Sequence, residues 1–304
     1  MIASDPASRL ARLRLSLDGL SIGDGFGEPF FLPGLGVRLI KRLAPDPPWR
    51  VTDDTVMALS IAEQLEAAGT IDQDALALTF ARRHAADPLR GYGGGARLIL
   101  KRIEAGAPWR VAARQSFDGK GSLGNGGAMR VAPLGAYFAD DLDQAAAQGA
   151  RSAEVTHAHP EGQAGAVAIA VAAALAARLG PVIADDPSAF VAEVAARTPA
   201  GPIQEGVARA AALPAGTSIA QAARAVGNGA RVIASDTVPL CVWAAARYAG
   251  SFEEALWQTV SVGGDMDTTC AIVGGIVALT VGREGLPPAW LTAREPLPWH
   301  LGRA

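Results

Sequence analysis

Cysteine, aromatic residues and blocks of like charge are scarce in this chain. Two of its 304 residues are cysteine, Cys241 and Cys270, and both lie in apolar, helix-like sequence. We therefore expect free buried thiols rather than a disulfide framework, and a reducing, cytoplasmic location. Acidic and basic residues are interspersed, and the net charge is −3. Because there is no basic block, no stable nucleic-acid binding is expected.

Long hydrophobic runs and strand patterns are also missing. The most apolar stretch, residues 164–177, is dominated by alanine and is too short to span a membrane, so it predicts a buried helix. Residues 1–20 alternate arginine with leucine and alanine, unlike a secretory signal. We expect no membrane association. No segment alternates polar and apolar residues as a half-buried strand does.

What the sequence does contain is helical periodicity. Half of the residues are hydrophobic, enough for a large core. Apolar spacing predicts helices near residues 8–20, 54–68, 72–85, 95–105, 107–115, 126–138, 142–158, 161–179, 187–197, 203–212, 219–226, 237–248, 252–262 and 268–281. Glycine- and proline-rich loops separate several of them, at 23–36, 45–48, 91–95 and 119–127. None of these loops is long enough to divide the chain. The sequence predicts one compact all-α domain over residues 1–304.

Two short acidic segments, far apart in the chain, each open an apolar helix. The first is Thr-Asp-Asp-Thr at 52–55, and the second is Gly-Gly-Asp-Met-Asp-Thr-Thr at 263–269. Acidic residues in a first helical turn also complement the helix dipole, which alone could explain the first segment. In the second, Asp265 and Asp267 can project to one side of a turn before an apolar, buried helix. Buried carboxylates need a partner, and no lysine or arginine adjoins them.

A pair of divalent cations would provide that partner. Carboxylate and hydroxyl oxygens suit Mg²⁺ or Mn²⁺. If folding brings both segments together, several carboxylates share a small space and cannot all stay ionised without compensation. We therefore predict a two-metal hydrolytic site.

Four further segments are weaker signals, each with a structural alternative. The glycine-rich stretch 121–130 could cradle a phosphate or simply turn between helices, and the same holds for 91–95. In Thr-His-Ala-His-Pro at 156–160, one histidine could hydrogen-bond a ligand, or the turn could cap a helix before Pro160. The stretch Gly23–Phe30 could be a mobile acidic lid or an ordinary connection.

Taken in order, these segments resemble the ADP-ribosylglycohydrolase family, which includes dinitrogenase reductase-activating glycohydrolase and the ADP-ribosyl-acceptor hydrolases. The family pattern has a GD-x-x-G loop, a TDDT helix start, a GNG-x-AMR loop, a TH pair and a closing GGD-x-DT. All five occur here in that order, beginning at Gly23, Thr52, Gly124, Thr156 and Gly263. They span most of the chain, and five motifs in register are a specific signal.

The resemblance implies an all-α fold with two Mg²⁺ or Mn²⁺ ions in a cleft, acting on ADP-ribosylated protein or another ADP-ribosyl conjugate. Carried across, the metal ligands are Thr52, Asp53, Asp54, Asp265, Asp267 and Thr268. The implied substrate-binding residues are Phe117, Gly121, Ser122, Leu123, Gly124, Asn125, His157, Gly93 and Gly95. Arg130 is expected to anchor a loop. Asp54 and Asp265 are the expected proton acceptors.

One position departs from the family pattern. Relatives often carry a glutamate several residues after the GD pair, where this chain has Phe31. Glu28 is the nearby glutamate, and we take it as a third catalytic candidate. The departure keeps a non-catalytic ADP-ribose binder as an alternative to a hydrolase. An all-helical, Mg²⁺-dependent isoprenoid synthase ranks lower, because aromatics are few and Asp53-Asp54 lacks a DDxxD spacing.

Overall fold

The computed structural model describes residues 2–298, and the elements below lie within them. Its α-helices are α1 (Pro6–Gly27), α2 (Gly36–Lys41), α3 (Asp53–Ala68), α4 (Gln73–Ala86), α5 (Gly94–Glu104), α6 (Trp109–Arg114), α7 (Gly126–Met129), α8 (Ala132–Tyr137), α9 (Leu142–Glu154), α10 (Pro160–Leu179), α11 (Pro187–Arg197), α12 (Pro202–Ala211), α13 (Ile219–Val226), α14 (Ala234–Arg247), α15 (Phe252–Val260), α16 (Met266–Val281) and α17 (Pro288–Ala293). Short 3₁₀ helices are η1 (Glu28–Phe31), η2 (Gly180–Ala184) and η3 (Arg283–Gly285). Within these residues no strand forms, only isolated bridges at Trp49–Arg294 and Gly124–Ile233. The predicted all-α fold is confirmed.

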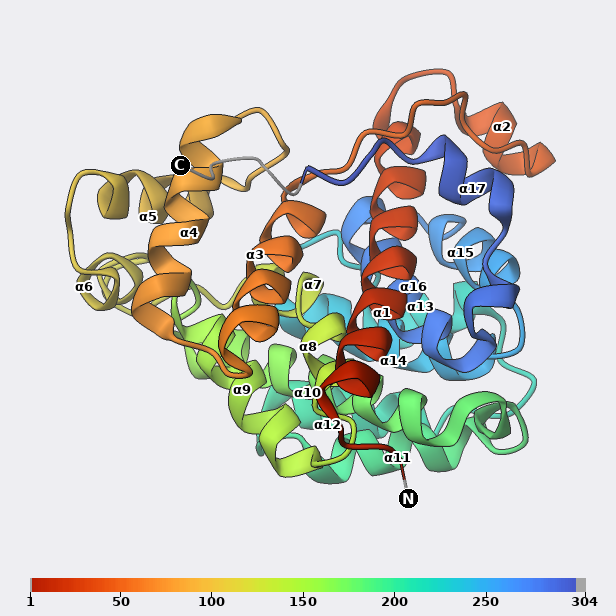
Figure 1. Ribbon diagram of the computed structural model, residues 1–304. Coiled ribbons are helices and arrows are strands. Elements are labelled where there is room, and N and C mark those ends of the chain that lie inside the picture. Colours follow the sequence, from red (N-terminus) through yellow and green to blue (C-terminus); the bar gives the residue numbers. More distant parts are fainter. Residues whose placement is uncertain (1, 299–304) are drawn as a thin grey trace.

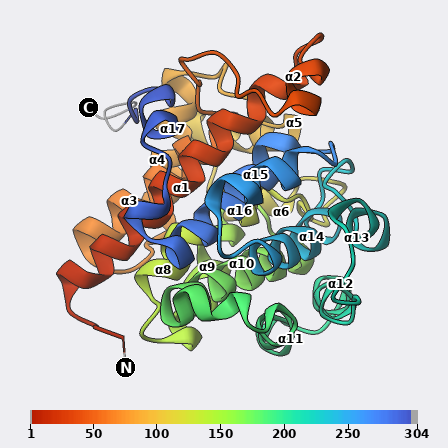
Figure 2. The same cartoon turned by 90° about the vertical axis from the view of Figure 1, so that its right-hand side faces the viewer.

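Helices α1 and α16 form the closest helix pair and lie side by side in both views (Figures 1 and 2). Glycine makes this approach possible, since a Cβ at Gly19, Gly23 or Gly27 would overlap the backbone of Gly274, Cys270 or Met266. The contacts run in opposite directions along the two helices, so the pair is antiparallel. The last turns of α1 therefore meet the first turn of α16.

This packing corrects the expectation of a loop over 23–36. Residues 23–27 continue α1, and η1 follows directly. Glycine normally weakens a helix, but here the close packing with α16 offsets that cost. The predicted helix 126–138 is also wrong in detail, because it breaks between α7 and α8. Pro133 lies at the start of α8 and cannot accommodate the carbonyl four residues earlier.

Two predicted features of α3 and α10 are confirmed. Thr52 caps α3 by accepting from the Asp54 amide, and Gly69 ends that helix in the left-handed region. Helix α10 is buried from Ala164 to Ala176 against α7, α8, α9, α14 and α16. Residues 160–184 are long and apolar enough to cross a membrane by composition, but 67% of the tested window is buried inside the protein. The pattern is that of a core helix.

Few aromatic side chains exist, yet several gather behind the end of α1. Phe26 contacts the rings of Phe30, Trp49, Trp257 and Trp290 at centroid distances of 4.7–5.6 Å. These residues come from distant parts of the chain and join the ends of α1 and α15 to α17. This aromatic cluster therefore fixes the position of the residues that follow Gly23. Both cysteines are free and buried, as expected.

Candidate functional site

Five carboxylates converge from three helix ends. They come from the last turns of α1, the start of α3 and the start of α16. We call these five residues the acidic cluster: Asp24, Asp53, Asp54, Asp265 and Asp267. Carboxylate oxygens of Asp24, Asp54 and Asp267 lie within 4.8 Å of one another. The amino ends of α3 and α16 carry partial positive charge, which favours carboxylates there.

Asp24 is the member that the sequence analysis left outside the site, in a segment expected to be a lid or an ordinary connection. Its carboxylate accepts hydrogen bonds from the Thr52 amide at 2.9 Å and from the Thr55 amide and hydroxyl at 3.2 and 2.5 Å. It thereby joins α1 to the first turn of α3. The Gly23-Asp24 pair of the first motif was the sequence signal for this residue. The continuation of α1 through residue 27 is what directs the Asp24 side chain toward α3.

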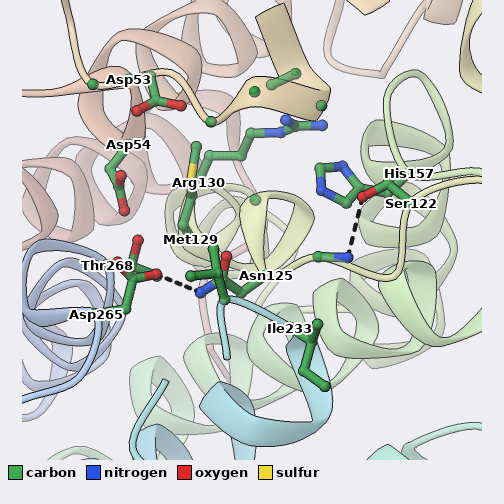
Figure 3. Close-up of a pocket in the computed structure, with 18 of the residues that line it drawn as sticks. Asp53, Asp54, Ser122, Asn125, Met129, Arg130, His157, Ile233, Asp265 and Thr268 are labelled. Carbon is green, nitrogen blue, oxygen red and sulfur yellow. Dashed lines mark hydrogen bonds between the residues drawn. The ribbon is translucent and has the colours of Figure 1, made fainter. Parts of the chain in front are cut away.

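Two of the other carboxylates, Asp54 and Asp265, are each oriented by a neighbour. The Thr52 hydroxyl lies 3.1 Å from Asp54 Oδ2. Asn125 Nδ2 donates to Asp265 Oδ2 at 2.7 Å and lies 3.1 Å from the Thr237 hydroxyl. This amide joins the glycine-rich loop directly to the acidic cluster (Figure 3).

Burial sets the protonation of the cluster. It raises the pKa of Asp53 to about 8 and that of Asp24 to about 6, and the neighbouring charge of Asp24 adds to the shift at Asp53. The pKa of Asp54 is raised well above its usual range by burial and then by Asp267. Burial and then Asp265 do the same to the pKa of Asp267. Without a cation, this cluster retains protons at neutral pH.

The donor set fits hard divalent cations. Asp24 Oδ1 and Asp54 Oδ1 are buried and have no hydrogen-bond partner among residues 2–298. Within the same residues, no arginine or lysine forms an ion pair with the cluster, although such pairs are frequent elsewhere. Unpaired buried carboxylate oxygens are costly unless a cation or proton compensates them. Thr52, Asp53, Asp54, Asp265, Asp267 and Thr268 remain the proposed ligands, and Asp24 adjoins them.

A cavity of about 540 Å³ opens beside the cluster. Figure 3 shows Asp53, Asp54 and Asp265 on one side of it and Ser122 and His157 on the other. Most of the sequence-predicted residues line it: Asp53, Asp54, Gly93, Gly95, Phe117, Ser122, Leu123, Gly124, Asn125, His157, Asp265, Asp267 and Thr268. Segments up to about two hundred residues apart in sequence thus share one cavity.

Three predicted residues do not line the cavity. Thr52 is buried behind Asp54 as its helix cap. Gly121 has a φ of 75° and packs against Ala158 and His159, so it shapes the loop rather than contacting the cavity. Glu28 lies outside the lining but next to the acidic cluster. Burial and then the charge of Asp24 raise its pKa, while Arg50 acts in the opposite direction.

The two histidines of the Thr-His-Ala-His-Pro segment have different roles, and each role is one of the two alternatives that the sequence left open. His157 lines the cavity and its Nδ1 lies 2.8 Å from the Thr156 hydroxyl. Burial lowers its pKa to about 3, so the ring is neutral. His159 instead caps α10, accepting from the Glu161 amide. One histidine therefore serves the cavity and the other serves the helix start.

Arg130 anchors a loop, as expected. Its Nη2 donates to the Ser152 carbonyl at 2.9 Å and to the Thr156 hydroxyl at 3.0 Å, and its guanidinium lies over the Phe80 ring. Burial lowers its pKa to about 9, partly offset by Asp53. This side chain fixes the end of α9 beneath the cavity.

One part of the cavity wall had no sequence signal. Residues 229–233, which we call the rim loop, contribute Arg231, Val232 and Ile233 to the lining. The loop pairs with the glycine-rich segment through the Gly124–Ile233 bridge. Its sequence matches no motif, so only the fold could bring it to the cavity.

Fold and cavity together define an all-helical protein with an acidic site for a small molecule. Comparison with known proteins makes this more specific. The sequence model of the family described as "ADP-ribosylglycohydrolase" matches residues 5–301. The chain belongs to the ADP-ribosylglycohydrolase family and is a glycohydrolase.

Individual relatives agree with this assignment. Human ADP-ribosylhydrolase ARH3 is 28% identical over 95% of this chain and 90% of its own length. ADP-ribosylarginine hydrolase Tri1 of Pseudomonas putida (strain GB-1) is 23% identical over 94% of this chain and 75% of its own. A solved structure, "ADP-ribosylglycohydrolase-related protein complex", superposes with a TM-score of 0.69 at 26% identity, covering 95% of this chain and 94% of that one. The family assignment leaves the isoprenoid synthase alternative without support.

Proposed function

We propose that this protein is a metal-dependent hydrolase that cleaves the glycosidic bond between ADP-ribose and an acceptor, releasing ADP-ribose. The acidic cluster with its unpaired buried oxygens, open to a cavity lined by the glycine-rich loop, is the observation that carries the proposal. The names of the relatives, which include an ADP-ribosylhydrolase and an ADP-ribosylarginine hydrolase, support the same substrate class. The acceptor can be a protein side chain, a nucleic-acid end or a small ester.

Two divalent cations, Mg²⁺ or Mn²⁺, held by the cluster would orient the ribose hydroxyls and make bound water more acidic. The residues of this chain do the rest. Asn125 holds Asp265 in place, and the neutral ring of His157 faces the substrate from the opposite wall. Asp54 or Asp265 accepts the proton of the attacking water. Cleavage passes through an oxocarbenium-like state, whose positive charge the carboxylates stabilise.

Glu28 is the candidate proton donor to the leaving acceptor. It begins η1, a 3₁₀ helix that ends at Phe31. Side chains three residues apart in a 3₁₀ helix lie on the same face, so Glu28 shares the face of Phe31 one turn earlier. Phe31 itself is 47% exposed and has no acidic group. Burial and then the charge of Asp24 raise the pKa of Glu28, which is the direction that a proton donor requires.

A panel of ADP-ribosylated substrates tests the proposal. Arginine-linked, serine-linked and ester-linked conjugates are incubated with Mg²⁺, with Mn²⁺ or with excess EDTA, and released ADP-ribose is quantified. We expect turnover of at least one conjugate with a metal and none in EDTA. Undiminished turnover in EDTA would contradict metal dependence. Tight ADP-ribose binding in calorimetry with no turnover of any conjugate would contradict the proposal and favour a binding module.

A further inference from the structure

A substrate containing a diphosphate meets an electrostatic obstacle in this cavity. Four lining residues are aspartates, and the diphosphate of ADP-ribose carries two negative charges of its own. Cations at the cluster would compensate the aspartates, but the diphosphate still needs donors. Of the described residues that line the cavity, two have cationic side chains, Arg130 and Arg231.

Arg130 is not available for this role. It is fully buried, and one terminal nitrogen already donates to Ser152 and Thr156. Its guanidinium lies 4.5 Å from the centre of the Phe80 ring, and the other terminal nitrogen faces the sulfur of Met57 at 3.5 Å. Turning toward a ligand would break these contacts beneath the cavity floor.

Arg231 has a free side chain on a fixed backbone. Within residues 2–298 its guanidinium makes no ion pair or hydrogen bond, and the residue is exposed. Its amide donates to Asp236 Oδ2 at 3.0 Å. The Asn125 amide lies 3.4 Å from the Val232 carbonyl, and the Ala234 amide donates to the Leu123 carbonyl at 3.0 Å. These bonds hold the rim loop against the glycine-rich loop.

The backbone conformation of the next residue indicates that the rim loop is held in a fixed position. Val232 has a φ of 55°, in the left-handed region that β-branched residues rarely adopt. Such strain persists only where the surrounding structure fixes the chain. The loop also touches the acidic cluster, since a Cβ at Gly229 would lie 3.0 Å from Asp265 Cβ. Arg231 therefore lies on the short segment that joins the cluster to the glycine-rich loop.

We propose that Arg231 binds the diphosphate of the substrate and makes this enzyme selective for ribosides that carry one. The inference rests on the proposed function and adds a specificity-determining residue to it. A guanidinium can donate two parallel hydrogen bonds to phosphate oxygens, and a preformed loop loses little freedom on binding. Arg231 contributes to ADP-ribose affinity and makes no contribution to the affinity for adenosine, which has no phosphate.

The test is calorimetry with ADP-ribose and with adenosine, in Mg²⁺ and separately in EDTA. Arg231→Gln is expected to weaken ADP-ribose binding about 10-fold and to leave adenosine binding unchanged. Arg231→Lys should recover part of the loss, because it restores the charge without the planar fork. Arg224→Gln is the matched control, since Arg224 is exposed on α13 and lies outside the cavity.

The outcomes separate this inference from the proposed function. An unchanged ADP-ribose affinity in Arg231→Gln, or an equal loss for adenosine, would overturn the inference even if conjugates are hydrolysed. A selective loss of ADP-ribose affinity supports it even if no conjugate is hydrolysed, which would count against the proposed function alone. If the KM for a conjugate rises while ADP-ribose affinity is unchanged, Arg231 contacts the acceptor and the inference is wrong.

Discussion

The two sides of the cavity are built differently. The acidic cluster is placed by helix ends, packed through glycines on α1 and α16. The opposite side is placed by loops, and three non-glycine residues in them have positive φ: Phe117, Asp118 and Val232. Helices bring like charges to fixed positions despite their repulsion. Loops instead present neutral and cationic groups, and backbone hydrogen bonds hold the rim loop against the glycine-rich loop. The comparison indicates that rigid helix packing is needed most where carboxylates of like charge lie close together.

The largest expected effect comes from removing a carboxylate from the helix-built side. Asp54→Ala and Asp265→Ala should each reduce turnover of an ADP-ribosyl conjugate about 1,000-fold, because a cation ligand and a proton acceptor are lost. Turnover is measured with Mg²⁺ or Mn²⁺, and circular dichroism checks that the fold is retained. Asp185→Ala, at an exposed aspartate outside the cavity, should have no effect. Activity that survives in both cluster variants would remove the basis of the mechanism.

The helix pair itself can be broken at one glycine. Gly23→Ala places a Cβ against the Cys270 carbonyl, and both backbones would have to move apart. We expect the free energy of unfolding to fall by about 3 kcal/mol in a denaturant titration. Gly216→Ala is the control, since a Cβ there meets open space and should change stability by less than about 0.5 kcal/mol. Equal effects at the two glycines would show that the α1–α16 contact is looser than described.

The charge of the acidic cluster predicts how stability depends on pH without cations. Burial raises the pKa of Asp53 from 3.8 to about 8 and that of Asp24 to about 6. Between the ordinary pKa of an aspartate and these raised values, the folded state binds more protons than the unfolded state. The free energy of unfolding therefore falls as pH rises from about 4 to 8. In EDTA, the melting temperature should therefore be lower at pH 8 than at pH 5.5.

Divalent cations should reverse that trend. Mg²⁺ or Mn²⁺ binds the ionised folded cluster, so stabilisation should be larger at pH 8 than at pH 5.5. Asp54→Asn removes one buried titratable carboxyl and should reduce both the pH dependence in EDTA and the response to cations. The same melting curve at both pH values, with or without cations, would contradict the proton-retaining cluster.

The smallest expected effect concerns the loop-built side. Val232→Gly relieves the left-handed strain, and the gain is partly cancelled by the greater freedom of glycine in the unfolded chain. We expect a change in unfolding free energy of less than about 1 kcal/mol, together with weaker ADP-ribose binding as the rim loop loosens. Thermal melts and calorimetry measure the two quantities. A large destabilisation would mean that Val232 packs as a core residue, despite its 54% exposure.

Local signals in the sequence predicted much of the helical framework. The start of α3 followed from Thr52 as a cap, and its end followed from Gly69. The end of α1 could not be predicted locally, because its glycines favour a loop until α16 packs against them. The break at Pro133 had a local cause that a longer apolar pattern concealed. Helices α2 and α17 are too short for periodicity to indicate.

The sequence by itself determined which chemistry is present: acidic helix starts, a glycine-rich loop and a family pattern in register. Only the tertiary structure decided which carboxylates lie together in the acidic cluster and which arginine side chain lines the cavity without a partner in the described part of the chain. Asp24 joined the cluster because an antiparallel helix pair turned it toward α3. Arg231 reached the cavity because the rim loop bonds to the glycine-rich loop. Both results depend on contacts between residues distant in the chain and on burial, neither of which a local pattern encodes.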